Sequence, residues 1–383
     1  MDASRFTAKD TGRLVRISEP HEDHAFVPAD LPPSWEMPTS LWPLLLEAHK
    51  ALSNLDGVGQ TLPDPQLLLR PLQQREALRS SSLEGTFATP EELLLFELNP
   101  RSADKDTEEV NEWREVFNYG IALQKGDEYL RQHPPNIAMI RELHKWLMNG
   151  VRGSNKRPGE IRRIQVFIGS NARFVPPPPI ELDSCLDALS EHLQTPMQQY
   201  DPLIGAYIIH YQFETIHPFH DGNGRIGRVL LALLTARWCS LSRPWLYMSP
   251  YFEKNREEYV SLLYEVSAKG AWTPWIEYCL RGTLEQARDA IRRCGKLRAL
   301  HSNYVNRLEA KSNPRLRTIT ENLFSTPILT IPQVVKQCGV TYPTAKSDVE
   351  TLLELDILRE MNSQRPRTFY CPEVFAAAYD DVL

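Results

Sequence analysis

Apolar residues recur at helical spacing along most of the chain. The segments LWPLLLEAHKAL and LLLRPLQQREALRSSSLEGT, between Leu41 and Glu97, show this spacing, and the second ends at Gly85, a residue suited to closing a helix. The spacing continues through EVNEWREVFNYGIALQKG and IAMIRELHKWLMNG, then through DPLIGAYIIHYQFETIH and RVLLALLTARW, and ends near Ala310. The pattern therefore predicts a mainly α-helical protein.

Two stretches depart from this helical pattern. The first forty residues hold several prolines among polar residues, as in VPADLPPSWEMPTS, which predicts an extended arm laid over another part of the protein. From Glu160 to Pro179, two short β-like runs flank Gly169, Ser170 and Asn171. These three residues favour a turn, so we expect a β-hairpin within the helical domain.

The last seventy residues follow a different order of elements. They predict a helix, a turn near Gly339, a second helix from about Pro343 to Leu355, and two short strands around NSQRPR. This order is typical of a winged helix-turn-helix.

The chain has 383 residues, which is long enough for two or three domains. The changes of pattern divide it into an N-terminal arm with a helical segment (1–98), a central domain (99–312) and a winged-helix domain (313–383).

Charge and cysteine usage narrow the class of protein. The formal net charge is -6, so nothing in the overall charge indicates a nucleic-acid or anionic-membrane binder. The six cysteines include no pair at C-x-x-C spacing, which argues against a disulfide framework or a zinc ribbon. The N-terminus lacks the apolar core of a targeting peptide, and the longest apolar run, Val229 to Ala236, is too short to span a bilayer. We expect a cytoplasmic protein without a membrane partner.

The candidate chemistry is concentrated in HPFHDGNGRIGR, from His217 to Arg228. Gly222, Asn223 and Gly224 stand at the start of a predicted helix, where consecutive backbone N–H groups and the helix dipole favour an anion. Arg225 and Arg228 lie three positions apart and share a helix face, which adds forked donors suited to phosphate oxygens. The loop is therefore predicted to hold phosphate groups.

Two further residues of this loop suggest a reaction. Asp221 precedes the glycines and could hold a Mg²⁺ ion that bridges two phosphates, which points to a nucleotide polyphosphate such as ATP. His217 lies across the loop and could take a proton from an attacking hydroxyl, a contribution of roughly 10²- to 10⁴-fold. The residues thus imply group transfer onto a hydroxyl. Depending on which way round the nucleotide lies, the transferred group is a nucleotidyl or a terminal phosphoryl group.

Other motifs share the same letters. GNGRIG satisfies G-x-G-x-x-G, but the preceding segment is helical rather than a strand, and the chain contains no V-A-I-K, H-R-D or D-F-G sequence. A metal-hydrolase site built from His217, His220 and Asp221 would leave both arginines unused. His220 on its own is interpreted as a structural residue.

The loop resembles the active-site signature of Fic-domain proteins, H-x-F-x-[DE]-G-N-G-R-x-x-R, and meets every fixed position, including Phe219. GEIRRIQVFIGSNARFVPPPP resembles the Fic flap, LHKWLMNGV the helix before it, and NREEYVSLLYEVSAKGAW the helix that lines the adenine pocket. The resemblance implies a Fic-type helical catalytic domain that transfers AMP from ATP to a Ser, Thr or Tyr hydroxyl of a target protein or of itself, with release of pyrophosphate.

The resemblance also assigns roles. His217 would deprotonate the target hydroxyl, and Asp221 would bind Mg²⁺. The anion hole, the β- and γ-phosphate contacts and the adenine contact would come, in that order, from Gly222, Asn223 and Gly224, from Arg225 and Arg228, and from Tyr259.

Upstream, SSSLEG is similar to the inhibitory motif [ST]-x-x-x-E-[GN] of Fic proteins that carry their own inhibitor. By this resemblance Ser80 and Glu84 form the motif, and Glu84 would pair with Arg228 and repel the γ-phosphate. The alternatives are a Fic enzyme that removes AMP or transfers another nucleotidyl or phosphoryl group, and a winged-helix regulator that only senses a nucleotide.

The two remaining modules suggest partners. The free edge of the predicted hairpin could pair with an extended target segment beside His217. The second helix of the winged-helix domain, PTAKSDVETLLELD, carries four acids, Asp348 among them, against Lys346 alone, while Arg365 and Arg367 lie in the wing. Phosphate binding needs a basic face, so protein docking or a homodimer is favoured over DNA binding.

Overall fold

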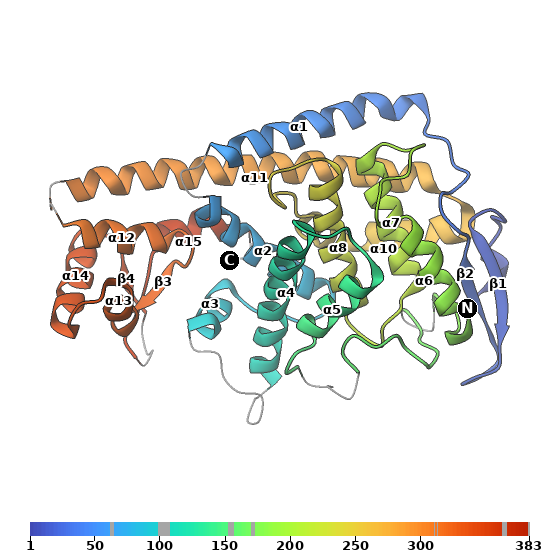
Figure 1. Ribbon diagram of the computed structural model, residues 1–383, viewed down its shortest axis with the longest axis horizontal. Helices are drawn as coiled ribbons and strands as arrows, with labels where there is room; N and C mark the ends of the chain where they lie inside the picture. The colour runs from blue at the N-terminus through green and yellow to red at the C-terminus, as the bar shows by residue number, and fades with distance from the viewer. Residues whose placement is uncertain are drawn as a thin grey trace.

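The structure, a computed structural model, is mainly helical (Figure 1). It describes residues 1–61, 65–98, 108–151, 157–169, 173–309, 311, 313–361 and 366–381. Before the C-terminal region the α-helices are α1 (Trp42–Gln60), α2 (Pro65–Leu83), α3 (Pro90–Leu98), α4 (Glu108–Leu130), α5 (Ile137–Leu147), α6 (Leu182–Glu191), α7 (Pro202–Ile216), α8 (Asn223–Trp238), α9 (Ser249–Lys254), α10 (Arg256–Lys269) and α11 (Trp272–Glu309). Short 3-10 helices lie at Ala3–Arg5, Thr39–Leu41 and Pro179–Glu181. The predicted helical class is confirmed.

The longest helix, α11, runs along one side of the molecule, and α1 lies beside it (Figure 1). Leu45, Ala48, Leu52 and Leu55 of α1 are buried at intervals of three and four residues, which gives the helix one apolar face. The C-terminal end of α11 reaches the C-terminal region of the chain. Of the described helices, not one has the length and apolar character required to cross a bilayer.

The first forty residues contain a hairpin that the prediction of an extended arm missed. Strands β1 (Gly12–Ile17) and β2 (Asp23–Pro28) pair antiparallel, and the backbone N of Phe26 donates to Val175 O at 2.8 Å. Phe26 is buried in this hairpin. Pro28 is the last residue of β2, an end position at which a strand tolerates proline.

The predicted central hairpin has fewer paired backbone residues than expected. One isolated bridge joins Ile168 and Phe174, closed by two backbone hydrogen bonds of 2.9 and 3.1 Å. The turn residues Ser170 and Asn171 lie outside the described residues. Pro176 to Pro179 cannot donate backbone hydrogen bonds, which limits the length of any ladder here. We call residues 160–179 the flap.

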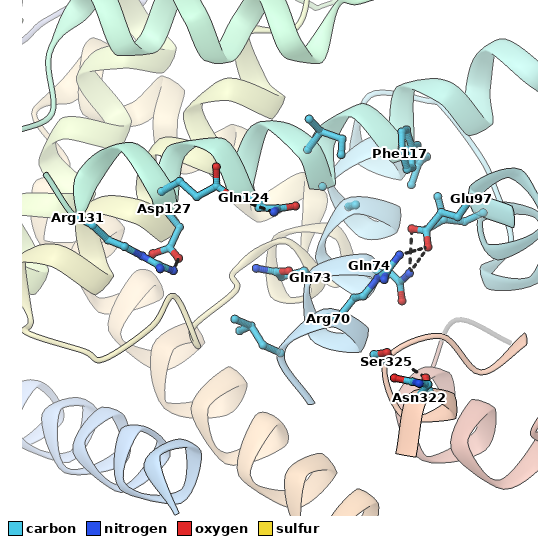
Figure 2. Close-up of a pocket in the computed structure, with 17 residues that line it drawn as sticks. Arg70, Gln73, Gln74, Glu97, Phe117, Gln124, Asp127, Arg131, Asn322 and Ser325 are labelled. Atoms are coloured by element: carbon cyan, nitrogen blue, oxygen red, sulfur yellow. Dashed lines mark hydrogen bonds and ion pairs between the residues drawn. The ribbon is translucent and has the colours of Figure 1, made fainter. Parts of the chain in front are cut away.

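Helix α2 packs against α4 and α9 and ends at Leu83, close to the predicted end at Gly85. Gly85 has φ 86°, in the left-handed region expected of a residue that closes a helix. A cavity of about 490 Å³ opens between α2 and α4 (Figure 2). Charged groups in its wall pair with one another, as in Arg70 with Glu97 and Arg131 with Asp127, and it contains none of the predicted site residues.

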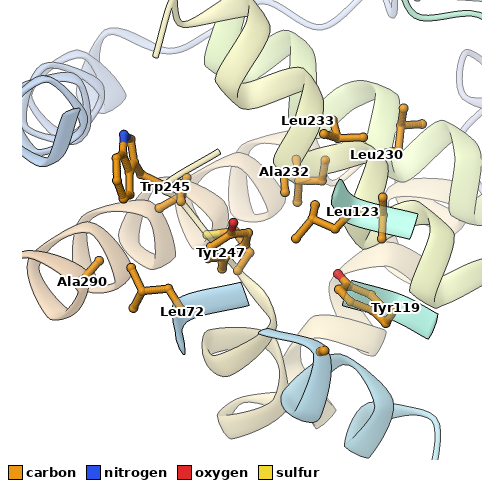
Figure 3. Close-up of a cluster of buried hydrophobic side chains, with 14 of the residues drawn as sticks. Leu72, Tyr119, Leu123, Leu230, Ala232, Leu233, Trp245, Tyr247 and Ala290 are labelled. Atoms are coloured by element: carbon orange, nitrogen blue, oxygen red, sulfur yellow. The ribbon is translucent and has the colours of Figure 1, made fainter. Parts of the chain in front are cut away.

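Helices α7 and α8 pack side by side at the centre of the molecule and are buried on nearly all faces. A helix that is apolar all round is typical of a core position. Figure 3 shows how this core joins helices distant in sequence, since Leu72 of α2, Tyr119 and Leu123 of α4 and Leu233 of α8 gather in it. The helix with the predicted inhibitory motif therefore shares the core of the central domain.

The C-terminal region has the predicted order of elements. Its members are α12 (Pro314–Leu323), β3 (Ile328–Thr330), α13 (Ile331–Cys338), α14 (Tyr342–Glu354), β4 (Arg359–Glu360), β5 (Thr368–Tyr370) and α15 (Pro372–Tyr379), with strand order β3-β5-β4. Helix α13 ends at Gly339, which has φ 63°. Part of the wing, including Arg365, lies outside the described residues. Both predicted domain boundaries adjoin such residues, so the division of the chain stays a prediction.

Candidate active site

The loop between α7 and α8 turns sharply at both of its ends. His217 ends α7 with φ 52°, and Gly222 precedes α8 with φ 74°, so both residues adopt the left-handed conformation. A residue with a side chain seldom adopts this φ, and such residues cluster at functional sites. Helix α8 begins at Asn223, so the first-turn N–H groups of Asn223 and Gly224 are not used within the helix.

Asn223 holds the loop closed through its side chain. Its Oδ1 accepts from the backbone N of Phe219, and its Nδ2 donates to the backbone O of Phe219, both at 2.8 Å. Phe219 is fully buried, as expected of the apolar anchor of the loop. We call the turn of Gly222, Asn223 and Gly224 the anion cradle. Asn223 shapes it with its side chain, in addition to the predicted contribution of its backbone.

His144 on α5 supports the loop from behind. Its ring stacks on Phe219 with centroids 3.9 Å apart. The backbone N of Gly159 donates to Nδ1 at 2.7 Å, so Nε2 carries the proton and donates to the backbone O of Asp221 at 3.0 Å. Burial lowers the pKa of His144 to about 4, which keeps the ring neutral. Sequence reasoning missed His144, whose sole signal is a polar residue on an apolar helix face.

Arg162 ties the flap to the same loop. Its Nε donates to the backbone O of His217 at 2.8 Å, its Nη1 to Ile164 O at 3.0 Å and its Nη2 to Pro177 O at 2.5 Å. The side chain is buried, and burial lowers its pKa to about 10. Sequence reasoning missed Arg162 because the adjacent Arg163 looks the same in the sequence.

His217 is placed to act as a base. Its Nδ1 lies 3.3 Å from the backbone O of Glu214, which accepts a hydrogen bond and so fixes the proton on Nδ1. The other nitrogen, Nε2, is then left with its lone pair. Burial lowers the pKa of His217 to about 4, so the ring is neutral near pH 7.

Arg228 is held by both residues of the predicted inhibitory motif. Its Nε donates to Oγ of Ser80 at 2.7 Å, and its Nη2 donates to Ser80 O at 2.8 Å and to Glu84 Oε1 at 2.7 Å. Burial opposes both charges, yet the pair raises the pKa of Arg228 and lowers that of Glu84. The structure therefore joins residues that the resemblance alone had paired.

Arg225 is also held by a carboxylate. Its Nη1 donates to Oε2 of Glu115 on α4 at 2.5 Å, and the hydroxyl of Thr86 donates to the same oxygen at 3.2 Å. Its Nη2 lies 3.7 Å from Oδ1 of Asp221. Sequence reasoning missed Glu115, which lies within an ordinary helical segment.

The residues present fit a magnesium ion bound together with phosphates. Asp221 places a partly exposed carboxylate at the start of the cradle, where Gly222 N donates to its Oδ1 at 2.7 Å. Among the described residues there is no group of three or more His, Cys, Asp or Glu side chains able to hold a metal. Mg²⁺ commonly uses one or two carboxylates, water and substrate phosphates, so a single aspartate suits this mode.

A cavity of about 330 Å³ brings five of the ten predicted site residues together, and the other five, Ser80, Asp221, Gly222, Asn223 and Arg225, do not line it. Glu84, His217, Gly224, Arg228 and Tyr259 line it, with flap residues on one side. The ring of Tyr259 stacks on Phe252 at 4.4 Å, and its hydroxyl hydrogen-bonds Nε2 of His210 at 2.9 Å, so the ring is fixed in the wall. The cavity thus combines an imidazole, a guanidinium group, one glycine of the loop and an aromatic ring.

Two family models match the chain in succession. The Fic/DOC family N-terminal model matches residues 42–128, and the Fic/DOC family model matches residues 134–235. The first range includes Ser80 and Glu84, and the second includes the loop from His217 to Arg228.

Curated relatives agree with the family models. The protein adenylyltransferase Fic of Drosophila erecta is 33% identical over 138 residues, covering 34% of this chain and 26% of that protein. The protein adenylyltransferase fic-1 of Caenorhabditis elegans is 28% identical over 221 residues, covering 56% of this chain and 40% of that protein. The chain thus matches less than half the length of these relatives.

Solved structures share the fold. A Fic family protein from Desulfovibrio desulfuricans has a TM-score of 0.55 at 19% identity, covering 88% of this chain and 98% of that one. Fic-1 from C. elegans has a TM-score of 0.53 at 20% identity, covering 66% of this chain and 73% of that one. Consecutive family models, curated relatives and a shared fold agree with the geometry of the loop, and residues 42–128 and 134–235 of the chain form a Fic/DOC family N-terminal domain and a Fic/DOC family domain.

Proposed function

We propose that this protein is a nucleotidyltransferase that moves AMP from Mg·ATP to a Ser, Thr or Tyr hydroxyl of a target protein or of itself. One observation carries the proposal: His217, Gly224, Arg228 and Tyr259 line a single cavity. The curated relatives named protein adenylyltransferase support this reaction over the phosphoryl transfer that the same groups could perform.

The reaction follows from the proton on His217. Because Nδ1–H is engaged by Glu214 O, Nε2 accepts the proton of the target hydroxyl as its oxygen attacks the α-phosphorus. The new bond joins that oxygen to phosphorus, the bond to the β-phosphate oxygen breaks, and pyrophosphate leaves. The N–H groups at the start of α8 stabilise the charge on the α-phosphate. Asp221 would hold Mg²⁺, which would offset the negative charge of the phosphates.

Inhibition by Glu84 is part of the proposal. In the structure Nε and Nη2 of Arg228 are engaged by Ser80 and Glu84, and a γ-phosphate would have to displace Glu84 to reach Nη2. The carboxylate would also repel the phosphate. ATP would then bind in an unproductive pose until Glu84 moves.

The proposal also includes a location in the cell and partners for the flap and the C-terminal domain. The six cysteines are free, which suits a reducing compartment, and we propose a cytoplasmic location. The flap would guide an extended target segment to His217, and the C-terminal domain would dock a protein or a second copy of the chain.

Removal of AMP from modified targets is the alternative activity, because Glu84 lies in the same cavity as His217.

The decisive experiment measures label transfer from ATP labelled at either the α- or the γ-phosphate, in Mg²⁺, for the parent protein, Glu84→Gly and His217→Ala. We expect transfer of the α-label alone, stronger in Glu84→Gly and absent in His217→Ala. Transfer of the γ-label alone would make the protein a kinase. Loss of modification from a pre-labelled target would instead support AMP removal. Retained ATP binding without any transfer would support the sensor alternative.

A further inference from the structure

Glu214 is an acid in the candidate cavity that the proposed reaction does not use. It lies on α7, one turn before His217, and lines the same cavity. Its Oε1 is buried and has no hydrogen-bond partner among the described residues. A Cβ atom at Gly227 would lie 2.1 Å from this oxygen, so glycine leaves the space that the carboxyl group occupies. A buried polar atom without a partner is unfavourable unless a ligand satisfies it.

Glu214 shares its cavity with the two residues proposed to contact the ends of a nucleotide. Arg228 and Tyr259 line this cavity together with Glu214. Arg228 is the proposed phosphate contact, and Tyr259 is the proposed contact for the base. The sugar of a nucleotide joins these two parts, so it would lie in the same cavity as Glu214.

The protonation state suits a hydroxyl ligand. Burial raises the pKa of Glu214 to about 8; Arg228 opposes this shift and Glu84 adds to it. At neutral pH the carboxyl group is therefore mainly protonated and does not repel phosphates. A protonated carboxyl offers one O–H donor and one C=O acceptor, which matches a sugar hydroxyl that can both accept and donate.

We propose that Glu214 hydrogen-bonds the 2′- or the 3′-hydroxyl of the ribose of the bound nucleotide and so selects nucleotides that carry this hydroxyl. This inference rests on the proposed function for the presence of a nucleotide. It adds a contact with the sugar that neither the sequence motif nor the family relationship assigns.

The test is calorimetric titration of Mg·ATP, 2′-deoxy-ATP and 3′-deoxy-ATP. The parent is the Glu84→Gly/His217→Ala protein, in which the cavity is open and turnover is blocked. We expect ATP to bind about tenfold more tightly than the analogue that lacks the contacted hydroxyl, the effect of one hydrogen bond. Adding Glu214→Val should weaken ATP about tenfold and leave that analogue unchanged. Adding Glu214→Gln, which keeps a donor and an acceptor, should preserve most of the preference.

Three outcomes count against the inference. Equal weakening of ATP and both analogues by Glu214→Val would reduce Glu214 to a structural role. A preference that survives Glu214→Val would place the sugar contact elsewhere. If Glu214→Val fails to fold, as judged by thermal unfolding, Glu214→Ala replaces it in the same comparison. Failure of the parent to bind ATP would overturn the proposed function, and the sugar contact with it.

A separate set of contacts joins the end of the C-terminal region to α2, the helix that ends one residue before Glu84. Asp381 contacts two arginines of α2. Nη2 of Arg75 lies 2.7 Å from Oδ2 of Asp381, and Nη2 of Arg79 donates to the backbone O of Asp381. We call the contacts of Tyr379 and Asp381 with α2 the clasp. The hydroxyl of Tyr379 donates to Oε1 of Gln74 at 2.5 Å. The three α2 residues precede Glu84 by up to three helical turns, so the clasp acts on the helix that positions the inhibitory carboxylate.

Buried charge makes this clasp strong. Arg293 of α11 is 1% exposed and donates from Nη2 to Oδ1 of Asp381 at 2.6 Å. Arg75 is also buried and has Asp289 as its other carboxylate, at 3.2 Å. Loss of Asp381 would remove one of the two carboxylates that pair with Arg75, and a buried charge that loses a partner is less stable. Displacement of Asp381 therefore disturbs α2 directly.

We infer that α15 and Asp381 hold α2 in its inhibitory position, so that movement of α15 releases Glu84 from Arg228. The effect on transfer rests on the proposed function, whereas the effect on α2 does not. A partner that binds the C-terminal region and moves α15 would thereby change the pairing of Glu84 with Arg228 in the cavity.

Asp381→Asn tests this coupling, with Asp380→Asn as the matched control. Among the described residues Asp380 pairs with α11 alone, through Arg292, Arg293 and Lys296. We expect Asp381→Asn to speed amide hydrogen exchange in α2 several-fold and to raise label transfer, with no further gain in the Glu84→Gly protein. Equal exchange in the two variants would overturn the clasp. Faster exchange in α2 without a change in transfer would separate the clasp from the proposed inhibition.

Discussion

Glu84 and Arg228 are 144 positions apart in the chain, yet Nη2 of Arg228 lies 2.7 Å from Oε1 of Glu84. Ser80, one turn earlier on α2, accepts from Nε and Nη2 of the same guanidinium. Arg228 is 3% exposed, while the side chain of Glu84 is 39% exposed at the cavity. The pair is therefore anchored on the arginine side and open to competition on the carboxylate side, which is the arrangement expected of a displaceable inhibitor.

Glu84→Gln should increase the affinity for Mg·ATP about tenfold. The amide keeps the shape of the carboxyl but removes the charge that repels a phosphate and competes for Arg228. Because a buried arginine loses its counter-charge, the free energy of unfolding should fall by roughly 1–3 kcal/mol, less than for a fully enclosed pair. Calorimetry and urea unfolding measure the two effects. Glu257→Gln, an exposed acid on α10, is the control, and an unchanged ATP affinity in Glu84→Gln would contradict the competition.

Arg162→Lys should nearly abolish transfer and lower the free energy of unfolding by roughly 2–4 kcal/mol. The planar guanidinium reaches carbonyl groups of the flap and of the catalytic loop at once, whereas an ammonium group cannot span them. Arg163→Lys is the matched control, since Arg163 is exposed next to it. Equal stability of the two variants would show that the flap does not depend on this link.

His210 should make the protein less stable in mild acid. It is 1% exposed between Gly227 O, 3.1 Å from Nδ1, and the hydroxyl of Tyr259. Burial, reinforced by Arg228, lowers its pKa from an ordinary 6.5 to about 3. Between those pH values the unfolded chain binds more protons than the folded one. The stability contributed by neutral His210 is therefore full above pH 6.5 and declines as the pH falls toward 3, by at most about 1.4 kcal/mol per pH unit.

Urea unfolding at a series of pH values measures this effect. His210→Gln should have a shallower dependence than the parent between about pH 4 and 6. His133→Gln, at an exposed position, should keep the parental slope. A His210→Gln protein with that same slope would show that the buried ring does not contribute to acid sensitivity.

The active-site loop could be predicted because its chemistry is local to twelve consecutive residues. Its supports could not. Glu115 is 110 positions from Arg225, His144 is 77 from Asp221, and Arg162 is 55 from His217. Each occurs in a helix or an irregular segment where polar residues are common, and only the tertiary packing shows which carbonyl or guanidinium each one meets.

The helical class could likewise be predicted, since α7 and α8 carry long apolar runs. The N-terminal hairpin was missed because β1 and β2 show no regular alternation of buried and exposed residues and the surrounding segment is rich in proline. The flap was predicted as a full hairpin, but it is held by one bridge and by the buried side chain of Arg162. A side chain that replaces a backbone ladder leaves no periodic signal in the sequence.

The structure changes one part of the case against DNA binding. Asp348 was counted among the surface acids of α14, but it is 4% exposed and pairs with Arg315, with Nε and Oδ2 2.8 Å apart. Among the exposed residues of α14, Glu350 lies 3.6 Å from Lys346. The negative charge of Glu350 therefore offsets the positive charge of the one lysine of the helix.

We therefore expect no retardation of duplex DNA by the protein in a gel-shift assay at about 50 mM salt, where non-specific phosphate contacts are strongest. In the described part of the wing, Arg367 is engaged by Glu360 in a two-pronged pair at 2.6 Å, so its forked donors are already used. Glu350→Lys/Glu360→Gln, which frees Lys346 and Arg367, should gain weak, salt-sensitive retardation and serves as the positive control. Retardation by the parent protein that weakens in Lys346→Glu would show that the acidic helix reads DNA after all.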